Sequence, residues 1–264
     1  MDSAIIASNK ALTKQFFQAA FIDFDLELTR QLITDQYIQH NPFVPSGAEA
    51  FMQILPILKE QNMVFSNHRL IADKEFVVSH NQVNNVPITG HNNVVTFDIW
   101  RVENGKLAEH WDNVTAFTAS RNPSGHTQID GATTVVDKHK TEQNKKLVLA
   151  FINAVLINGK VDSMPEYLST DHYVEHNPQI SDGIDTLSDT FKTIAEKVTL
   201  MRVQTIHLAV AEGNFVFTMS EGTSVYGKKT AFYNLFRVEN DKIVEHWDVI
   251  EKLPEAWAHE NGKF

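Results

Sequence analysis

The sequence predicts an α+β protein built from two tandem copies of one small domain. The first observation is that the string RVENGKLAEHWD at residues 101–112 returns as RVENDKIVEHWD at residues 237–248, a spacing of 136 residues. The second is that YIQHNP at 37–42 returns as YVEHNP at 173–178 with the same spacing. The third is that helical periodicity precedes strand alternation in each copy. The spacing of 136 residues is the size of a domain and too long for one solenoid repeat.

About three helices are predicted at the beginning of each copy. Apolar residues recur at helical spacing in the first of them, so this stripe should face a core. The second is short and precedes the His-Asn-Pro element, which should be extended because proline disfavours helix at the residue before it. Pro56 should kink the third helix of the first copy. The predicted ranges are 8–22, 26–33 and 48–60 in the first copy, and a helix beginning after Thr141, 163–168 and 184–197 in the second.

A meander of long antiparallel strands follows the helices. Aromatic and β-branched residues alternate there with polar ones, which is the pattern of a sheet with one face buried. Asn104-Gly105 is a strong signal for a two-residue hairpin, and Asn240-Asp241 is a weaker form of the same signal. The strands predicted in the first copy are 67–72, 75–86, 93–103 and 106–118.

The segment between the two copies is rich in Ser, Thr, Asn, Gly and Asp, and it contains turn sequences at 122–125 and 130–131. Such a composition is typical of a linker. We therefore predict a first domain at 1–120, a linker at 121–140 and a second domain at 141–264.

Composition excludes several classes of function. The net charge is −10, from 33 acidic and 23 basic residues, and no basic cluster is longer than a pair, which disfavours a nucleic-acid partner. The absence of cysteine excludes disulfides, a thiolate nucleophile and a Cys-ligated metal. The N-terminus does not resemble a secretory signal, and no stretch approaches the roughly 18 apolar residues of a spanning helix. We therefore expect a cytoplasmic protein with no membrane partner.

The element order, YIQHNP and YVEHNP, and FDIWRVENGKLAEHWD with its copy together resemble the SnoaL-like polyketide-cyclase branch of the nuclear transport factor 2-like superfamily. The resemblance covers nearly the whole chain except the linker and the C-terminal tail. It implies a cone-shaped α+β barrel in each copy, with a curved antiparallel sheet wrapped on about three helices around a deep pocket. Members often pair through the outer face of the sheet, so the chain resembles an intramolecular pseudo-dimer, which could pair again as a homodimer.

The resemblance also implies candidate site residues in the first copy. Enzymes of this superfamily commonly place a pocket Asp near His or Tyr, to remove a proton next to a carbonyl and stabilise the enolate. Burial in an apolar pocket raises the pKa of such a carboxyl group toward the working pH. Asp98 is the leading candidate for the base, and His40, His80 and His110 are candidates for proton donors or enolate stabilisers. The alternative for Asp98 is a structural hydrogen bond.

The repeated His-Trp-Asp string carries a further ambiguity. His110 recurs as His246, and a residue kept in both copies fits a structural hydrogen bond as well as a catalytic role. Trp111 and Asp112 are interpreted as structural.

The second copy is expected to have an altered pocket. Asn234 stands in place of Asp98, and Met219 stands in place of His80. An amide cannot act as the base, and a thioether cannot carry a proton. The candidate pocket residues of this copy are His176, Met219, Asn234 and His246.

Three functions follow as hypotheses, because members of the superfamily include isomerases, aldol-type cyclases, dehydratases and non-catalytic binding domains. The first is cofactor-free proton transfer on a small carbonyl compound in the first-copy pocket. The second is binding of a small apolar ligand without turnover. The third is metal-dependent chemistry, since imidazole and carboxylate groups bind Zn²⁺ and other divalent ions. The predicted metal ligands are His40, His80, His110 and Asp98; no other cofactor is expected.

Overall fold

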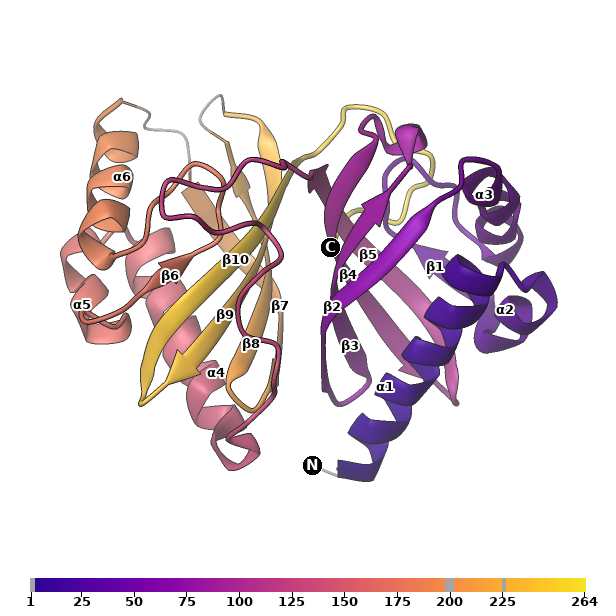
Figure 1. The fold of residues 1–264 in the computed structure, drawn as a ribbon, viewed down its shortest axis with the longest axis horizontal. Helices are drawn as coiled ribbons and strands as arrows, with labels where there is room; N and C mark the ends of the chain where they lie inside the picture. Colours follow the sequence, from indigo (N-terminus) through magenta and orange to yellow (C-terminus); the bar gives the residue numbers. More distant parts are fainter. Residues whose placement is uncertain (1–2, 198–201, 225–226) are drawn as a thin grey trace. The chain divides into compact units, whose positions relative to one another are not determined.

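The computed structural model describes residues 3–197, 202–224 and 227–264. The chain divides into two compact units (Figure 1). Unit 1 contains Met1–Phe117 and Pro254–Phe264, and unit 2 contains Thr118–Leu253. Each unit has one sheet with its helices, so the predicted α+β class with two tandem copies is confirmed.

The sheet of unit 1 has five strands in the order β1-β5-β4-β3-β2. Strand β1 runs parallel to β5, whereas the other neighbours are antiparallel. The predicted meander is confirmed, and β1 is a further strand that was not predicted from the sequence. The predicted sheet with helices is confirmed; it is open between its edges β1 and β2 rather than closed into a barrel, and β1 makes it mixed rather than fully antiparallel. The bounds are β1 Ile33–Gln39, β2 Val64–Asp73, β3 Phe76–Asn84, β4 Asn93–Glu103 and β5 Lys106–Ala116.

The sheet of unit 2 repeats this topology in the order β6-β10-β9-β8-β7, with β6 parallel to β10. It is likewise open rather than closed. Both predicted hairpin turns are present, because Asn104, Gly105, Asn240 and Asp241 all have positive φ. The bounds are β6 Val174–Glu175, β7 Arg202–Glu212, β8 Phe215–Thr223, β9 Lys229–Glu239 and β10 Lys242–Lys252.

The helices of each unit lie on one face of its sheet, which we call the inner face (Figure 1). Apolar side chains of this face and of the helices form one core in each unit. In unit 1 the helical elements are α1 Ser3–Phe17, the π-helix η1 Gln18–Asp23, α2 Leu26–Leu32 and α3 Ala48–Glu60, with a 3-10 turn η2 at Pro87–Thr89. In unit 2 they are α4 Thr141–Phe151, the π-helix η4 Ile152–Ile157, α5 Met164–Tyr167 and α6 Ile184–Lys197, with 3-10 turns η3 Lys138–Lys140 and η5 Val161–Ser163.

The predicted domain ranges differ from the compact units at both boundaries. Residues 118–140 belong to unit 2, where Asn122 donates hydrogen bonds to the carbonyl oxygens of Glu175 and Ile180. The tail Pro254–Phe264 belongs to unit 1, where Asn261 donates a hydrogen bond to the carbonyl oxygen of Gln39. Each unit is therefore completed by the segment that follows the last strand of the other copy.

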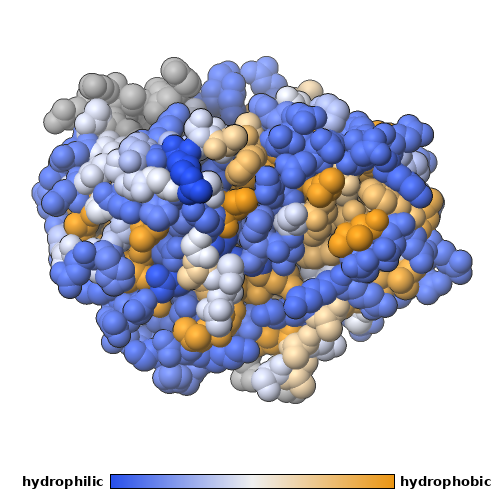
Figure 2. Space-filling model, in the orientation of Figure 1, coloured by the Kyte–Doolittle hydropathy of each residue, from blue (hydrophilic) through white to orange (hydrophobic). Residues whose placement is uncertain are grey.

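The visible surface is mostly hydrophilic, in keeping with the acidic composition (Figure 2). Apolar side chains reach the surface mainly over the helices of unit 1, where Ile5, Ile22, Leu26 and Ile57 are exposed. Among the helices that the structure describes, none has the length and apolar character needed to span a membrane.

Candidate functional site

Strand register decides which predicted site residues of unit 1 share a face. Asp98 pairs with Asp112, and Trp100 pairs with His110. Directly paired residues point to the same face, and Trp100 belongs to the core under the helices. Asp98, His110 and Asp112 therefore lie on the inner face.

His80 and His40 lie on the opposite, outer face. His80 pairs with Phe97, the neighbour of Asp98, and its ring stacks on Phe97 with the centroids 4.4 Å apart. Its Nδ1 lies 3.1 Å from Nη1 of Arg69. The prediction that His80 acts together with Asp98 is therefore wrong, because alternation sends neighbouring residues of a strand to opposite faces.

His40 follows the end of β1 and stacks on Trp111, with the ring centroids 4.6 Å apart. Its Nε2 faces Glu109 at 2.8 Å. Burial acts to raise the pKa of Glu109, but hydrogen bonds from His40 and Arg101 outweigh it, and the net pKa is lowered. Since the sheet separates His40 from Asp98, the predicted fourfold metal ligand set cannot hold one ion.

The inner face of unit 1 does bring two predicted residues together. His110 Nε2 lies 3.0 Å from Oδ1 of Asp98, and His110 Nδ1 lies 2.9 Å from Oε1 of Gln39. Asn81 donates a 2.7 Å hydrogen bond to the other Asp98 oxygen. The imidazole thus has a carboxylate on its Nε2 side and an amide on its Nδ1 side.

Aromatic side chains occupy the space above this pair. Phe16 packs on Trp100 and Phe51, with ring centroids 4.8 Å and 5.7 Å away. Phe21 packs on Phe65, with the centroids 5.1 Å apart. These rings belong to the core between the helices and the inner face of unit 1.

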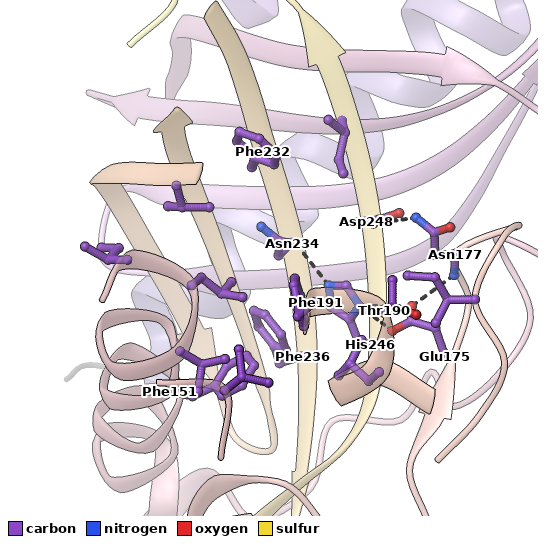
Figure 3. A pocket seen from close by; sticks show the side chains of 18 of the residues that line it. Phe151, Glu175, Asn177, Thr190, Phe191, Phe232, Asn234, Phe236, His246 and Asp248 are labelled. Carbon is purple, nitrogen blue, oxygen red and sulfur yellow. Dashed lines mark hydrogen bonds and ion pairs between the residues drawn. The ribbon is translucent and has the colours of Figure 1, made fainter. Parts of the chain in front are cut away.

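Unit 2 contains a cavity of about 450 Å³ between its helices and the inner face of its sheet. Four phenylalanine rings line it: Phe151, Phe191, Phe232 and Phe236. Five polar side chains from β9, β10 and the segment 175–177 lie near one another on one side of the cavity: Glu175, Asn177, Asn234, His246 and Asp248 (Figure 3). Asn158, Thr190 and Arg202 are further polar residues of the lining. A mostly apolar cavity with a few convergent polar groups is the usual form of a small-molecule site.

Two residues that line this cavity are smaller than their counterparts in unit 1. Leu187 occupies the position that Phe51 has in the first copy, 136 residues earlier. Phe236 likewise replaces Trp100. Both units have a π-helix after their first helix, and in unit 2 this π-helix, η4, contributes Leu156 to the lining of the cavity.

The polar side of the cavity reverses the arrangement found in unit 1. His246 Nδ1 lies 3.0 Å from both oxygens of Glu175, and His246 Nε2 lies 3.0 Å from Oδ1 of Asn234. Glu175 takes the position of Gln39, and Asn234 takes that of Asp98. Unit 2 therefore has an amide where unit 1 has the carboxylate of Asp98, and it has the carboxylate of Glu175 on the other side of the imidazole.

Electrostatics favour an ion pair between these groups. Burial alone would lower the pKa of His246, but the carboxylate of Glu175 reverses this and the net pKa is raised. Burial acts to raise the pKa of Glu175, but the charge of His246 and several hydrogen bonds outweigh it, and the net pKa is lowered. One of these bonds comes from the Tyr173 hydroxyl at 2.9 Å. His246 is therefore a cation over an extended pH range.

Asp248 is a second carboxyl group on the cavity wall. Burial raises its pKa; the positive charge of His246 opposes this shift and the negative charge of Glu175 reinforces it. Asn177 donates a 2.8 Å hydrogen bond to Oδ2 of Asp248. A carboxyl group with a raised pKa beside a fixed cation is a candidate general base.

The predicted second-copy set is only partly brought together. His246 and Asn234 line the cavity. Met219 pairs with Tyr233, the neighbour of Asn234, and therefore lies on the outer face. His176 stacks on Trp247, whose neighbour His246 lines the cavity, so His176 also lies on the outer face.

The sequence analysis missed Glu175, Asn177 and Asp248 as site residues. Glu175 had a signal, because it is the one charged substitution within the repeated YIQHNP element. Asp248 repeats Asp112 at the end of the duplicated string, which fits a role in the site, but such a repeat also fits a structural role. Only the cavity distinguishes the two interpretations.

Comparison with known families identifies both halves. Residues 13–110 match the model of the SnoaL-like domain, and residues 146–256 match that of the SnoaL-like polyketide cyclase. The comparison with curated proteins found no match.

Solved structures of single-domain size resemble part of the chain. TsrD from Streptomyces laurentii is 23% identical, with 43% of this chain and 90% of that chain covered and a TM-score of 0.37. An LEH-like epoxide hydrolase from M. tuberculosis is 12% identical, with 42% and 84% covered and a TM-score of 0.35. An NTF2-like protein from Mesorhizobium loti is 17% identical, with 45% and 98% covered and a TM-score of 0.38.

The assignment rests on the two domain matches, which together span most of the chain, and the repeated fold agrees with them. The chain therefore belongs to the SnoaL-like family, as two tandem SnoaL-like domains.

Proposed function

We propose that unit 2 is a cofactor-free cyclase or isomerase that removes a proton from a carbon next to a carbonyl group. The observation that carries this proposal is the raised pKa of Asp248 in an apolar cavity, beside the cation of His246. The substrate is a small, largely apolar compound with an aromatic portion, because four phenylalanine rings line the cavity.

Asp248 is the base in this reaction. Asn177 binds Oδ2 of Asp248, so Oδ1 is the oxygen that takes the proton. The electron pair of the broken C–H bond passes into the substrate as an enolate. A positioned base of this kind contributes roughly 10²–10⁴ in rate.

Asn234 stabilises the enolate oxygen. Its Oδ1 accepts a hydrogen bond from the His246 cation, so its Nδ2 is the group that donates to the substrate. The positive charge of His246, held by Glu175, polarises this amide. His246 acts as a positioning and electrostatic residue, because both ring nitrogens already have partners.

A second candidate places the same chemistry in unit 1, as the sequence analysis predicts. It is favoured by the 3.0 Å contact between His110 and Asp98. Asp112 also occupies the position of Asp248 and accepts a 2.7 Å hydrogen bond from Asn41. Binding without turnover is the remaining alternative for either unit.

The test is proton exchange on carbon, which does not require the natural substrate. A panel of mono- to tricyclic aromatic ketones and β-keto esters is incubated with the full chain in D₂O. Deuterium incorporation next to the carbonyl is followed by NMR. We expect Asp248→Asn to lower the exchange rate by about 10²–10⁴, since it removes the base.

Asp112→Asn is the matched control, because it makes the same change at the equivalent position of unit 1. It should leave the rate unchanged. If Asp112→Asn or Asp98→Asn abolishes exchange and Asp248→Asn does not, the reaction belongs to unit 1. If the full chain binds panel members but exchanges none of them, the protein is a binding protein.

A further inference from the structure

Unit 2 contains another cluster of titratable side chains, which the proposed reaction does not use. It consists of His176, next to Glu175 in sequence, together with His126 and Asp130 from the segment before α4. One nitrogen or oxygen atom from each of the three lies within 4.8 Å of the others. His176 is fully buried, whereas His126 and Asp130 are partly exposed, so the cluster can be reached from solvent.

Both imidazoles of this cluster have a carboxylate behind them. His126 Nε2 faces Asp182 at 3.1 Å, and His176 Nε2 faces Glu245 at 3.0 Å. The opposite nitrogens both face Asp130: His126 Nδ1 lies 3.9 Å from Oδ2, and His176 Nδ1 lies 2.9 Å from Oδ1. A carboxylate that accepts from one ring nitrogen fixes the tautomer that presents the other nitrogen as a ligand.

We propose that His126, His176 and Asp130 bind a divalent first-row metal ion, with Zn²⁺ as the best match. Two imidazole nitrogens and one carboxylate oxygen form an accepted zinc ligand set. Ligand atoms about 2.0–2.2 Å from an ion lie roughly 3–4 Å from one another, which is close to the spacing found here. The fourth position is left for water or for the Thr127 carbonyl, 2.8 Å from His176 Nδ1.

The charge of the surroundings favours a cation. Asp130, Asp182 and Glu245 place three carboxylates around two imidazoles. Arg237 offsets part of this negative charge through its contact with Glu245, and Arg121 offsets more of it through its 3.7 Å contact with Asp130. His176 also contacts the Thr127 carbonyl oxygen through Nδ1 and Glu245 through Nε2.

The segment that supplies two of the ligands is held rigidly. Thr127 and Asp130 exchange hydrogen bonds of 3.0 Å and 3.1 Å, each from a backbone N–H to the other side chain. Gly131 follows with φ +91°, and a Cβ atom there would lie 2.8 Å from His176 Nε2. Only glycine fits this approach, so the ligands are positioned before any ion arrives.

The test is isothermal titration calorimetry, in which the chelator-treated full chain is titrated with Zn²⁺. We expect saturable binding of one equivalent, which His126→Ala abolishes. Asp182→Asn should weaken it by about 10–100-fold, because it removes the carboxylate behind His126. His259→Ala is the matched control: His259 lies near His40 in unit 1, with ring centroids 6.4 Å apart, but its Nε2 binds the carbonyl of Asn41.

A Co²⁺ titration adds a spectroscopic readout, since a nitrogen and oxygen site of low coordination number gives visible absorption. Circular dichroism of metal-free His126→Ala checks that the variant folds. Absence of saturable Zn²⁺ binding to the wild-type chain would overturn the proposal. Equal binding by wild type and a folded His126→Ala would overturn it as well.

Discussion

At the scale of single residues, the equivalent histidines His110 and His246 differ in which of their two hydrogen-bond partners is a carboxylate. In unit 1 the carboxylate is Asp98, on the Nε2 side of His110. In unit 2 it is Glu175, on the Nδ1 side of His246. Because the carboxylate and the amide have swapped positions, the amide of Asn234 faces the cavity, where an enolate oxygen needs a donor.

The pH dependence of activity follows from this arrangement. Asp248 must be ionised to accept a proton, so the rate rises with pH through its raised pKa. His246 must keep its proton, so the rate falls as the pH passes its own raised pKa. The account therefore predicts a bell-shaped profile whose two limbs belong to a coupled pair.

Glu175→Gln should move both limbs to lower pH. The alkaline limb moves because the carboxylate that raises the pKa of His246 is gone. The acid limb moves because Glu175 also raises the pKa of Asp248. The pH profile of deuterium exchange measures both limbs, and an alkaline limb that stays in place would contradict the role of His246.

At the scale of elements, alternation and periodicity predicted the regular structure well. The helices Ala48–Glu60 and Ile184–Lys197 and the strand Asn93–Glu103 have the predicted bounds. The edge strand Ile33–Gln39 was missed, because an edge strand paired on one side needs only a weak pattern of its own. The π-helices were also missed, since their wider turns leave no distinct signal over six residues.

The site was less predictable than the elements, for a physical reason. Alternation tells which residues of one strand share a face, but the register between strands decides how those faces combine. His80 pairs with Phe97 rather than with Asp98. This difference of one residue in register places His80 and Asp98 on opposite faces of the sheet. The cavity depended on substitutions such as Leu187 for Phe51, whose effect appears only when the helices are packed.

The segment 118–140, whose composition predicted a linker, packs as part of unit 2. Asn122 is buried, donates to the carbonyls of Glu175 and Ile180, and accepts from the backbone N–H groups of Ser124 and His126. Asn122→Ala should lower the local opening free energy of unit 2 by about 1–3 kcal/mol, because buried backbone groups lose their partners.

Hydrogen exchange of β9 and β10 peptides, read by mass spectrometry in the presence of a chelator, measures this change. Ser120→Ala is the control, because Ser120 is exposed, and its effect should stay within about 0.5 kcal/mol. An Asn122→Ala variant that exchanges like the control would show that the segment is only a tether.

At the scale of the whole molecule, the two copies share a fold but differ in their interiors. Unit 1 fills its inner face with rings, which favours packing over binding. Unit 2 keeps a cavity and charged groups whose pKa values are displaced from their ordinary values. These differences favour the proposed reaction in the second copy, whereas the sequence favoured the first because Asp98 has no carboxylate counterpart at position 234.

The most direct test fills the cavity with the residue that unit 1 uses. Leu187→Phe should abolish both binding of the aromatic ketones and deuterium exchange, because it places a ring in the 450 Å³ cavity. Phe51→Leu, the reciprocal change in unit 1, should leave both unchanged. Circular dichroism confirms that both variants fold. Full exchange activity in a folded Leu187→Phe variant would contradict the claim that the substrate binds in unit 2.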